Sequence, residues 1–376
     1  MKRLVLAIGA LTTVGLAGLV SLRVLTDSSG AGDLIAGGYD LVGLDGSAQA
    51  IRDYGMQPVP SVLVILGWSL LLGTVGVWVV LWSLNVLVDI VPGRWRESIR
   101  PYVYVAPAFG LLTFFLLYPL VATIYFSVTE GEGPANFVSV IGDEDVQRAL
   151  INNLLWLVVA TGGSVLLGLI IAQLFDRVRR EALAKTFVFL PLALSMVGAS
   201  VIWRFMYLWR PPGQPQIGVI NAVATGVGRD PIPILQEIPL NTFALIAIMV
   251  WLQTGFAMVI LSAAIKSVPG ELLEASRLDG ANEFQVFTRI IVPSIRPSII
   301  TVATTIAVAV LKVFDIVFVM TGGRFDTEVI ANRMFAEMFK FRDFGRASAI
   351  AVILFAMVLP VMWLNLRNFR RQEAQA

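Results

Sequence analysis

Eight apolar segments, each long enough to cross a membrane as a helix, recur along this chain of 376 residues. A spanning helix needs roughly 20 mainly apolar residues to cross about 30 Å of hydrocarbon, where every backbone polar group must be paired within the protein. The chain is 57% hydrophobic and only 14% charged, which is outside the range of ordinary soluble domains. The sequence therefore predicts an all-α polytopic membrane protein. The expected spans are residues 4–22, 60–88, 102–128, 150–174, 186–207, 241–265, 298–320 and 347–363.

The first segment allows two interpretations. Met1, Lys2 and Arg3 followed by an apolar run are also how a signal peptide begins. However, no cleavage pattern of small residues follows, and Arg23 interrupts the end of the run. These features favour a retained helix. We expect residues 1–100 to form two N-terminal helices joined by an outer loop, and residues 101–376 to form a six-helix core.

Basic residues lie in every alternate connection between the spans, at positions 2–3, 94–100, 177–185, 266–296 and 367–371. In membrane proteins the cytoplasmic connections carry the excess of Lys and Arg. We therefore expect both termini, and the connection after the sixth span, to lie in the cytoplasm. Because the basic residues are dispersed in short clusters between spans, nucleic-acid binding is not expected.

The chain contains no cysteine and no histidine, which excludes disulfides, thiolate nucleophiles and imidazole-ligated metals. It also lacks the Gly-x-x-x-x-Gly-Lys-[Ser/Thr] loop, whose backbone amides and lysine hold a triphosphate. We expect the chain to have no enzymatic activity and to bind no cofactor or metal itself.

A polar insert at residues 266–297 separates the sixth and seventh spans and must sit in water. Its first half predicts a short helix, because Leu272, Ala275 and Leu278 recur at helical spacing. Pro269 permits the helix to start, and Gly280 supplies a turn at its end.

The second half of the insert predicts another short helix. Asn282 with Gln285 three residues later is typical of a capping box. Phe284, Phe287 and Ile291 would give this helix an apolar stripe. An insert patterned in this way is expected to dock a partner.

The insert also carries a family resemblance. Glu274-Ala275-Ser276, followed after three residues by Gly280 and after nine more by Ile290, with Val292-Pro293 beyond, resembles the EAA signature of permease subunits of ABC importers. Asp279-Gly280-Ala281 fits the same signature, while Ser276 and Val292 depart from its usual Ala and Leu. Residues 314–323 and 343–349, with Phe137, Asn152 and Asn153, resemble further stretches of carbohydrate-importer permeases, and the likeness covers residues 102–370.

The resemblance implies a permease subunit of an ATP-driven sugar importer of the maltose and alpha-glucoside type, in the bacterial inner membrane. This subunit would form half of the translocation pathway. The implied partners are a second, different permease, two ATP-binding subunits that hold ATP and Mg²⁺, and an extracytoplasmic solute-binding protein that delivers the sugar. Membrane lipid surrounds the spans.

The resemblance places the contact with the ATP-binding subunit on the insert, because rigid short helices can convert closure of a partner into tilting of the spanning helices. We expect Glu274 to be a polar anchor, Gly280 to allow a close backbone approach, and Asp279 to cap local amides of the turn. The full set expected at this contact is Glu274, Ala275, Ser276, Asp279, Gly280, Ala281 and Pro293.

The substrate path is expected on the helices that flank the insert, as in the maltose-type permeases that the chain resembles. The candidates are Trp251, Gln253, Thr254 and Phe256 before the insert, and Thr304, Thr305, Lys312 and Asp315 after it. Aromatic faces with hydroxyl and amide groups suit a sugar, whose hydroxyls must be hydrogen-bonded once they leave water. Met249, Ile306, Val310 and Val313 are apolar where a maltose permease would be polar. Either the site lies mainly on the partner permease, or the sugar differs.

Lys312 and Asp315 are charges within an expected span. Charges inside a membrane are costly and usually face protein or water. At an i, i+3 spacing they could pair with each other and stabilise the bundle, or they could border the substrate cavity.

Three alternatives remain from the sequence. The chain could be a permease for a non-sugar solute. It could be an ion-coupled secondary transporter, which would predict internal repeats and deep carboxylates, and neither is evident in the sequence. A membrane scaffold would explain the insert but not the polar groups on both flanking helices.

Overall fold

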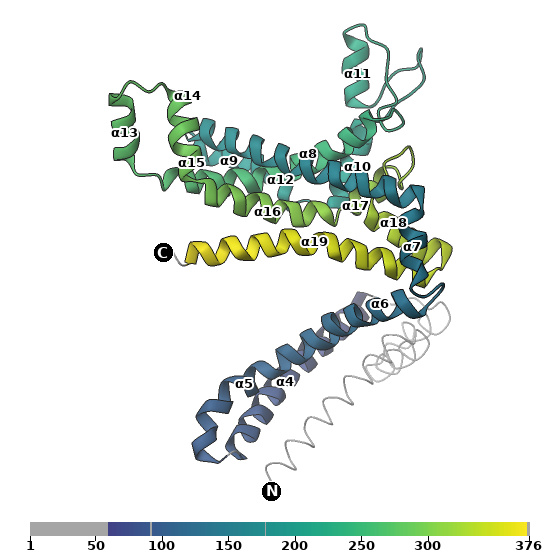
Figure 1. The fold of residues 1–376 in the computed structure, drawn as a ribbon, viewed down its shortest axis with the longest axis vertical. Helices are drawn as coiled ribbons and strands as arrows, with labels where there is room; N and C mark the ends of the chain where they lie inside the picture. Colours follow the sequence, from purple (N-terminus) through teal and green to yellow (C-terminus); the bar gives the residue numbers. More distant parts are fainter. Residues whose placement is uncertain (1–58, 91, 177, 374–376) are drawn as a thin grey trace. The chain divides into compact units, whose positions relative to one another are not determined.

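The computed structural model describes residues 59–90, 92–176 and 178–373, and every regular element within them is a helix (Figure 1). The chain forms two compact units, of which the first ends at Tyr118 and the second begins at Pro119. The predicted first span and the outer loop after it lie outside the described residues. The division into N-terminal helices and core at residues 100/101 stays a prediction.

The first unit contains α4 (Val59–Ile90), α5 (Gly93–Leu112) and the π-helical segment η1 (Thr113–Leu117). α4 covers the predicted span at 60–88 and packs against α5. It ends at Ile90, two residues before Pro92. After η1 the helix continues into α6 (Tyr118–Thr129), so Trp95–Thr129 forms one apolar helical stretch where 102–128 was predicted.

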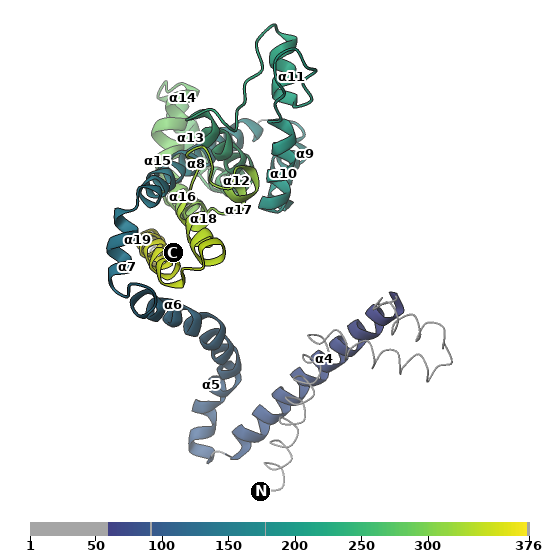
Figure 2. The ribbon, with the colours of Figure 1, turned by 90° about the vertical axis from the view of Figure 1, so that its right-hand side faces the viewer.

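The second unit is a helical bundle in which α8, α12, α16 and α19 run alongside one another, and Figure 2 views it nearly along these helices. Its helices are α7 (Ala135–Gly142), α8 (Glu144–Phe175), α9 (Glu181–Phe189), η2 (Leu190–Ala193), α10 (Met196–Met206), α11 (Val219–Gly226), α12 (Leu240–Lys266), α13 (Gly270–Leu278), α14 (Glu283–Val286), η3 (Phe287–Ile291), α15 (Val292–Ser294), α16 (Arg296–Leu311), α17 (Asp315–Met320), α18 (Ile330–Phe335), η4 (Ala336–Phe341) and α19 (Phe344–Glu373).

α12 is the central helix of this bundle. It packs most extensively against α8, and Trp156, Ile248 and Met258 are fully buried in the shared core. Small residues let the two backbones approach closely, as is common between membrane helices. A Cβ at Gly168 of α8 would lie 2.5 Å from the Cβ of Ala257 on α12, so only glycine fits there.

Two predicted spans are broken in the structure. The span predicted at 186–207 bends by 102° between Glu181–Ala193 and Met196–Met206. Pro191 lies in the intervening 3₁₀ turn, and the hydroxyl of Ser195 accepts a hydrogen bond from the amide of Gly198 at 3.0 Å, which starts a new helix. A proline and an N-cap residue therefore interrupt an apolar run that the sequence reading treated as continuous.

The span predicted at 298–320 ends early, because α16 stops at Leu311 and α17 begins at Asp315. The buried side chain of Asn153 on α8 donates a hydrogen bond to the carbonyl of Leu311 at 3.0 Å. This bond satisfies one of the carbonyl groups that a helix leaves unpaired at its C-terminus.

By length and composition, the described residues contain four helices that could cross a membrane, or up to six if each bent pair forms one span. The second of these bent pairs consists of Glu283–Ser294 and Arg296–Leu311, and it is bent by 71°. The chain is thus a mainly helical membrane protein, and the total of eight spans stays a prediction.

Candidate coupling insert and translocation path

The insert between α12 and α16 folds as the sequence predicted, into short helices joined by a glycine turn (Figure 1). After α13, the amide of Gly280 donates to the carbonyl of Arg277, and the amide of Ala281 donates to that of Ser276, each at 3.1 Å. This pair of bonds is the Schellman arrangement that ends many helices. It requires a left-handed residue, and Gly280 has a φ of +86°.

The next helix, α14, starts with the predicted capping box. The side chain of Asn282 accepts from the amide of Gln285, and the side chain of Gln285 accepts from the amide of Asn282, both at 2.9 Å. An ion pair of 2.9 Å between Arg277 and Glu283 spans the turn. The two helices are therefore joined by backbone, side-chain and ionic contacts.

Most of the residues predicted at the contact with the ATP-binding subunit are accessible. Glu274, Ala275, Asp279, Gly280 and Pro293 are exposed. Of the other two, Ala281 is half-buried, and Ser276 is buried with its hydroxyl bonded to the carbonyl of Leu273 at 2.7 Å. Ser276 thus packs inside the insert.

One detail predicted for the insert is wrong. The side chain of Asp279 makes no hydrogen bond to any residue that the structure describes, because backbone bonds already close the turn. The apolar residues of the two helices differ in exposure. Leu278 is 89% exposed and Phe284 is 73% exposed, whereas Val286 and Ile291 are buried. The insert therefore presents large apolar side chains to its surroundings beside Glu274.

A charged cluster that the sequence reading missed holds the base of the insert. Lys185 on α9 forms a 2.8 Å ion pair with Asp176 at the end of α8, and Ser262 on α12 donates to Asp176 at 2.9 Å. Lys266, the last residue of α12, pairs with Glu181 at the start of α9. The helix that leads into the insert is thereby fixed to the connection between α8 and α9.

The residues predicted for the substrate path lie on the expected helices, but the hydroxyl groups there are already bonded. Thr254 donates to the carbonyl of Val250 at 2.6 Å, and Thr305 donates to that of Thr301 at 2.9 Å. Thr304 donates within the same helix, to the carbonyl of Ile300 at 2.9 Å. These side chains stay available only as additional acceptors.

The aromatic candidates pack within the protein. Trp251 meets Trp203 of α10 edge to face at a centroid distance of 5.7 Å, and Phe256 packs against the core. Gln253 is half-buried on the same helix. The apolar positions that set this chain apart, Met249, Ile306, Val310 and Val313, are all buried core residues.

Lys312 and Asp315 do not share a helix, because Lys312 follows the end of α16 and Asp315 begins α17. No ion pair joins them in the described structure, which argues against the first of the two alternatives. Lys312 is exposed and Asp315 is half-buried.

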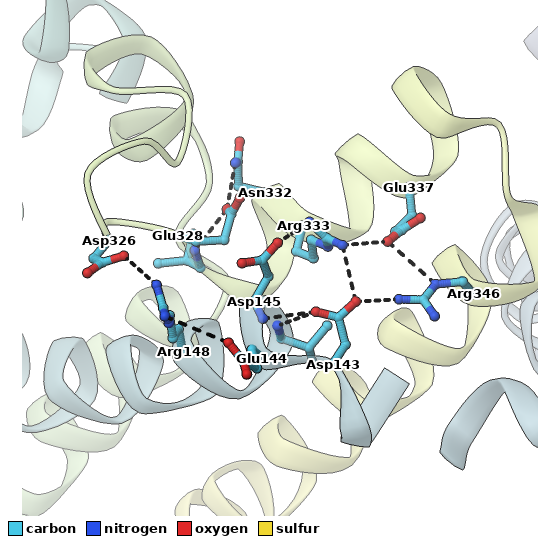
Figure 3. Close-up of polar contacts among 12 residues, drawn as sticks. Asp143, Glu144, Asp145, Arg148, Asp326, Glu328, Asn332, Arg333, Glu337 and Arg346 are labelled. Atoms are coloured by element: carbon cyan, nitrogen blue, oxygen red, sulfur yellow. Dashed lines mark hydrogen bonds and ion pairs between the residues drawn. The ribbon is translucent and has the colours of Figure 1, made fainter. Parts of the chain in front are cut away.

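A dense ionic network lies at the N-terminus of α8 (Figure 3). Asp143 caps the helix by accepting from the amide of Asp145 at 2.9 Å, and it also binds Arg346 at 2.6 Å and Arg333 at 3.3 Å. Both arginines also contact the nearly buried Glu337, at 3.0 and 3.6 Å. Burial alone would raise the pKa of Asp143, but the amide and the two guanidinium groups hold that pKa below its ordinary value.

Residues 343–349, which resemble a stretch of carbohydrate-importer permeases, have structural roles beside this network. Asp343 accepts from the amide of Arg346 at 2.9 Å, which orients the start of α19. A Cβ at Gly345 would lie 2.6 Å from the carbonyl oxygen of Glu130, so glycine permits the helix to approach the turn after α6. The arginine partners of the acidic residues at 143–145 lie about 190 residues away in the sequence, so no local pattern indicated them.

Asn152 and Asn153, noted in the sequence as a family feature, bridge α8 to the loop after α17. Asn152 donates to the carbonyls of Asp326 and Glu328 at 2.7 and 2.9 Å. Asn153 accepts from the amide of Ile330 at 2.9 Å while it holds Leu311. Two neighbouring side-chain amides of α8 thus hold the end of α16 and the loop between α17 and α18.

Comparison with known proteins identifies the family. Residues 164–373 match the family described as binding-protein-dependent transport system inner membrane component. The chain is 54% identical, over 72% of its length and 99% of the relative, to the osmoprotective compounds uptake permease protein GgtC of Synechocystis sp.. It is 43% identical, over 78% of its length and 93% of the relative, to the alpha-glucoside transport system permease protein AglF of Rhizobium meliloti.

The fold is that of a solved importer subunit. A chain of a bacterial ABC transporter involved in the import of the acidic polysaccharide alginate matches with a TM-score of 0.64 and 22% identity, covering 74% of this chain and 99% of that one. Because the family match spans more than half of the chain and two relatives are aligned over nearly their whole length, the chain belongs to the binding-protein-dependent transport system inner membrane components, the permeases of ABC importers.

Proposed function

We propose that this permease carries a sugar of the alpha-glucoside class across the bacterial inner membrane. The observation that carries the proposal is the sequence identity to AglF, together with the trehalose/maltose permease MalF of Thermococcus litoralis, which is 24% identical over 97% of that protein. The likeness to GgtC makes an osmoprotective solute the second candidate.

The permease would act in a larger assembly. A second, different permease would complete the pathway, two ATP-binding subunits would bind ATP and Mg²⁺, and an extracytoplasmic protein would deliver the solute. In support, a solved alginate transporter with the same fold was crystallised in complex with a solute-bound periplasmic protein. The chain itself would bind no cofactor. Both termini and the insert would face the cytoplasm, as the alternation of basic clusters predicts.

The insert would receive the movement of the ATP-binding subunit. Leu278 and Phe284 supply exposed apolar contact area, and Glu274, on the same helix as Leu278, supplies an exposed charge. Burying an apolar group while pairing a rim charge is how protein interfaces gain affinity and orientation. The capped turn would then pass the movement to α12 and α16 at its two ends.

The solute would pass along α12 and α16. Trp251, Gln253, Thr254 and Phe256 on α12, with Thr304 and Thr305 on α16 and Lys312 and Asp315 beyond it, are the residues of this chain proposed to border the path. Since the threonine hydroxyls donate to their own helices, they would meet a sugar as acceptors, and donors would come from Gln253, Lys312 or the partner permease.

Uptake by vesicles that contain all four kinds of subunit tests this function. The vesicles should accumulate an alpha-glucoside when ATP is enclosed with the ATP-binding subunits, and an ion gradient without ATP should give no uptake. Accumulation of an osmoprotective solute in place of the glucoside would favour the second candidate. Uptake driven by an ion gradient alone would contradict the proposal.

A further inference from the structure

A cavity of about 320 Å³ lies at the end of the bundle opposite the insert. Its wall comes from the last turn of α10, the connection that leads into α12, and the loop after α17, and it includes Arg204, Tyr207, Trp209, Gln236, Arg324 and Phe325. α12 runs 27 residues from this cavity to the insert, which is about 40 Å at 1.5 Å per residue. The two features therefore lie near opposite surfaces of the membrane.

Two guanidinium groups converge in this cavity. Arg204 donates to the carbonyl of Val319 and Arg324 donates to the carbonyl of Thr321, each at 3.3 Å, so both reach the C-terminal end of α17. Each guanidinium has five N–H groups, so most of its donors are left for a ligand. Within the described residues, neither arginine forms an ion pair with a carboxylate.

The aromatic polar groups of the wall donate elsewhere, so the free donors described for the cavity are those of the two arginines. The hydroxyl of Tyr207 donates to the carbonyl of Ala244 at 3.0 Å, and the indole of Trp209 donates to that of Pro231 at 3.2 Å. These two aromatic residues therefore contribute mainly their rings. Two positive charges with free donors and no internal counter-charge favour an oxyanion.

The position of the cavity indicates where that oxyanion comes from. Arg204 lies in the last turn of α10, at the end of a segment that could cross the membrane, and Tyr207 and Trp209 follow directly. Tyr and Trp are enriched at membrane interfaces, and arginines at helix ends reach the headgroup layer. Leu208, Leu235 and Met320 add apolar surface to the same wall.

We propose that this cavity binds the phosphate of an anionic phospholipid headgroup. The two arginines would hold the phosphate oxygens through charge-assisted hydrogen bonds, while the apolar part of the wall contacts the glycerol and the first carbons of the acyl chains. The inference does not depend on which solute the permease carries, because it concerns only the lipid that contacts the ends of its helices.

Lipid retention measured by native mass spectrometry tests the site. The purified full-length chain would be mixed with equal amounts of phosphatidylglycerol and phosphatidylcholine, and the bound lipid counted for wild type, Arg204→Gln and Arg324→Gln. A surface charge near a membrane lipid changes binding by about fivefold, so each substitution should weaken phosphatidylglycerol retention by about that factor. Arg229→Gln is the matched control, because Arg229 is an exposed residue of the same connection and does not line the cavity.

Further measurements distinguish a lipid phosphate from free phosphate and from a carboxylate of a partner protein. Inorganic phosphate at millimolar concentration should not displace the lipid; if it does so and stabilises the protein as well as the lipid does, the site binds free phosphate and the proposal is wrong. Equal lipid retention by all variants also overturns it. So does a loss of affinity for the solute-binding protein with unchanged lipid retention, which would assign the arginines to a protein carboxylate. If a glutamine variant unfolds, Arg204→Lys and Arg324→Lys replace it, because lysine keeps the charge but offers fewer donors. Each lysine variant should retain less phosphatidylglycerol than wild type and Arg229→Gln do, but more than none.

Discussion

The ammonium group of Lys266, the last residue of α12, donates a hydrogen bond to the carboxylate of Glu181, the first residue of α9. Lys185 and Asp176 extend this contact into a cluster at the base of the insert. Any movement of the insert therefore reaches α9 and α8 as well as α12. This connection leads to the first prediction.

Lys266→Gln and Glu181→Gln should each lower the amount of solute transported per ATP hydrolysed, because each loosens the base of the insert. The double variant should transport as much solute per ATP as the more affected single variant does, since both changes remove the same contact. Transport and ATP hydrolysis would be measured together in proteoliposomes. Arg179→Gln removes a nearby exposed charge that has no ion pair within the described structure, and it should behave as wild type. Additive losses in the double variant would argue against a shared contact.

The buried side chain of Asn153 should be important for stability. Asn153→Ala would leave the carbonyl of Leu311 and the amide of Ile330 without their partner, at about 1–3 kcal/mol for each unsatisfied buried group. Asn152 is only half-buried, so Asn152→Ala should destabilise by less, about 0.5–1.5 kcal/mol for each lost bond. Thermal unfolding in detergent measures both. Equal effects of the two variants would contradict the structural role given to Asn153.

Asp143 is expected to be the most sensitive residue of the ionic network at the N-terminus of α8. Asp143→Asn removes the charge that holds Arg333 and Arg346, and hydrogen bonds to charged groups contribute about 1.5–3 kcal/mol each. Because the folded state lowers the pKa of Asp143, its stabilisation is present above the ordinary value of 3.8 and is lost as the pH falls through the lowered pKa. The neighbouring Glu144, 87% exposed, serves as the control, and Glu144→Gln should change stability by less than about 0.5 kcal/mol. If the difference in stability between Asp143→Asn and Glu144→Gln does not shrink as the pH is lowered, the charge of Asp143 is not the cause of that difference.

Glu328 should have the opposite pH dependence. Its burial is the largest influence and raises its pKa above the ordinary value of 4.5, although Asn332 and the amide of Val329 oppose the shift. The protonated form is therefore favoured in the folded state, and the stability it contributes is lost as the pH rises through the raised pKa. Glu328→Gln keeps an acceptor oxygen and removes the charge, so it should raise the unfolding temperature near neutral pH and have no effect below about pH 4. Asp279→Asn, at an exposed carboxylate, should show no such dependence.

Sequence reasoning succeeded where the determinants are local. The Gly280 turn and the capping box of Asn282 and Gln285 involve residues within a few positions of each other, and both formed as predicted. It failed where a distant partner decides. Apolar content alone made 298–320 one helix, but the capping of Leu311 comes from Asn153, 158 positions away. The partners of Asp143 are equally distant, so no local pattern could reveal them.

The exposed apolar face of the insert shows a different limit. Leu278 on α13 and Phe284 on α14 each belong to a run of apolar residues at helical spacing, and that spacing normally marks a face that packs inside the protein. Of the second run Ile291 is buried, as is Val286 outside it, while Leu278 and Phe284 are exposed. Periodicity predicts an amphipathic helix but not what covers it, and a partner subunit is proposed as the cover.

The most direct test of the proposed coupling compares alanine at two glycines of the insert. A Cβ has open space at both Gly280 and Gly270, but only Gly280 has a positive φ, which costs other residues about 1–2 kcal/mol. Gly280→Ala should therefore distort the turn between α13 and α14, whereas Gly270→Ala should not. In proteoliposomes with all subunits, Gly280→Ala is expected to keep its expression and ATP hydrolysis while solute uptake falls, and Gly270→Ala should transport as wild type. Wild-type uptake by Gly280→Ala would contradict the account.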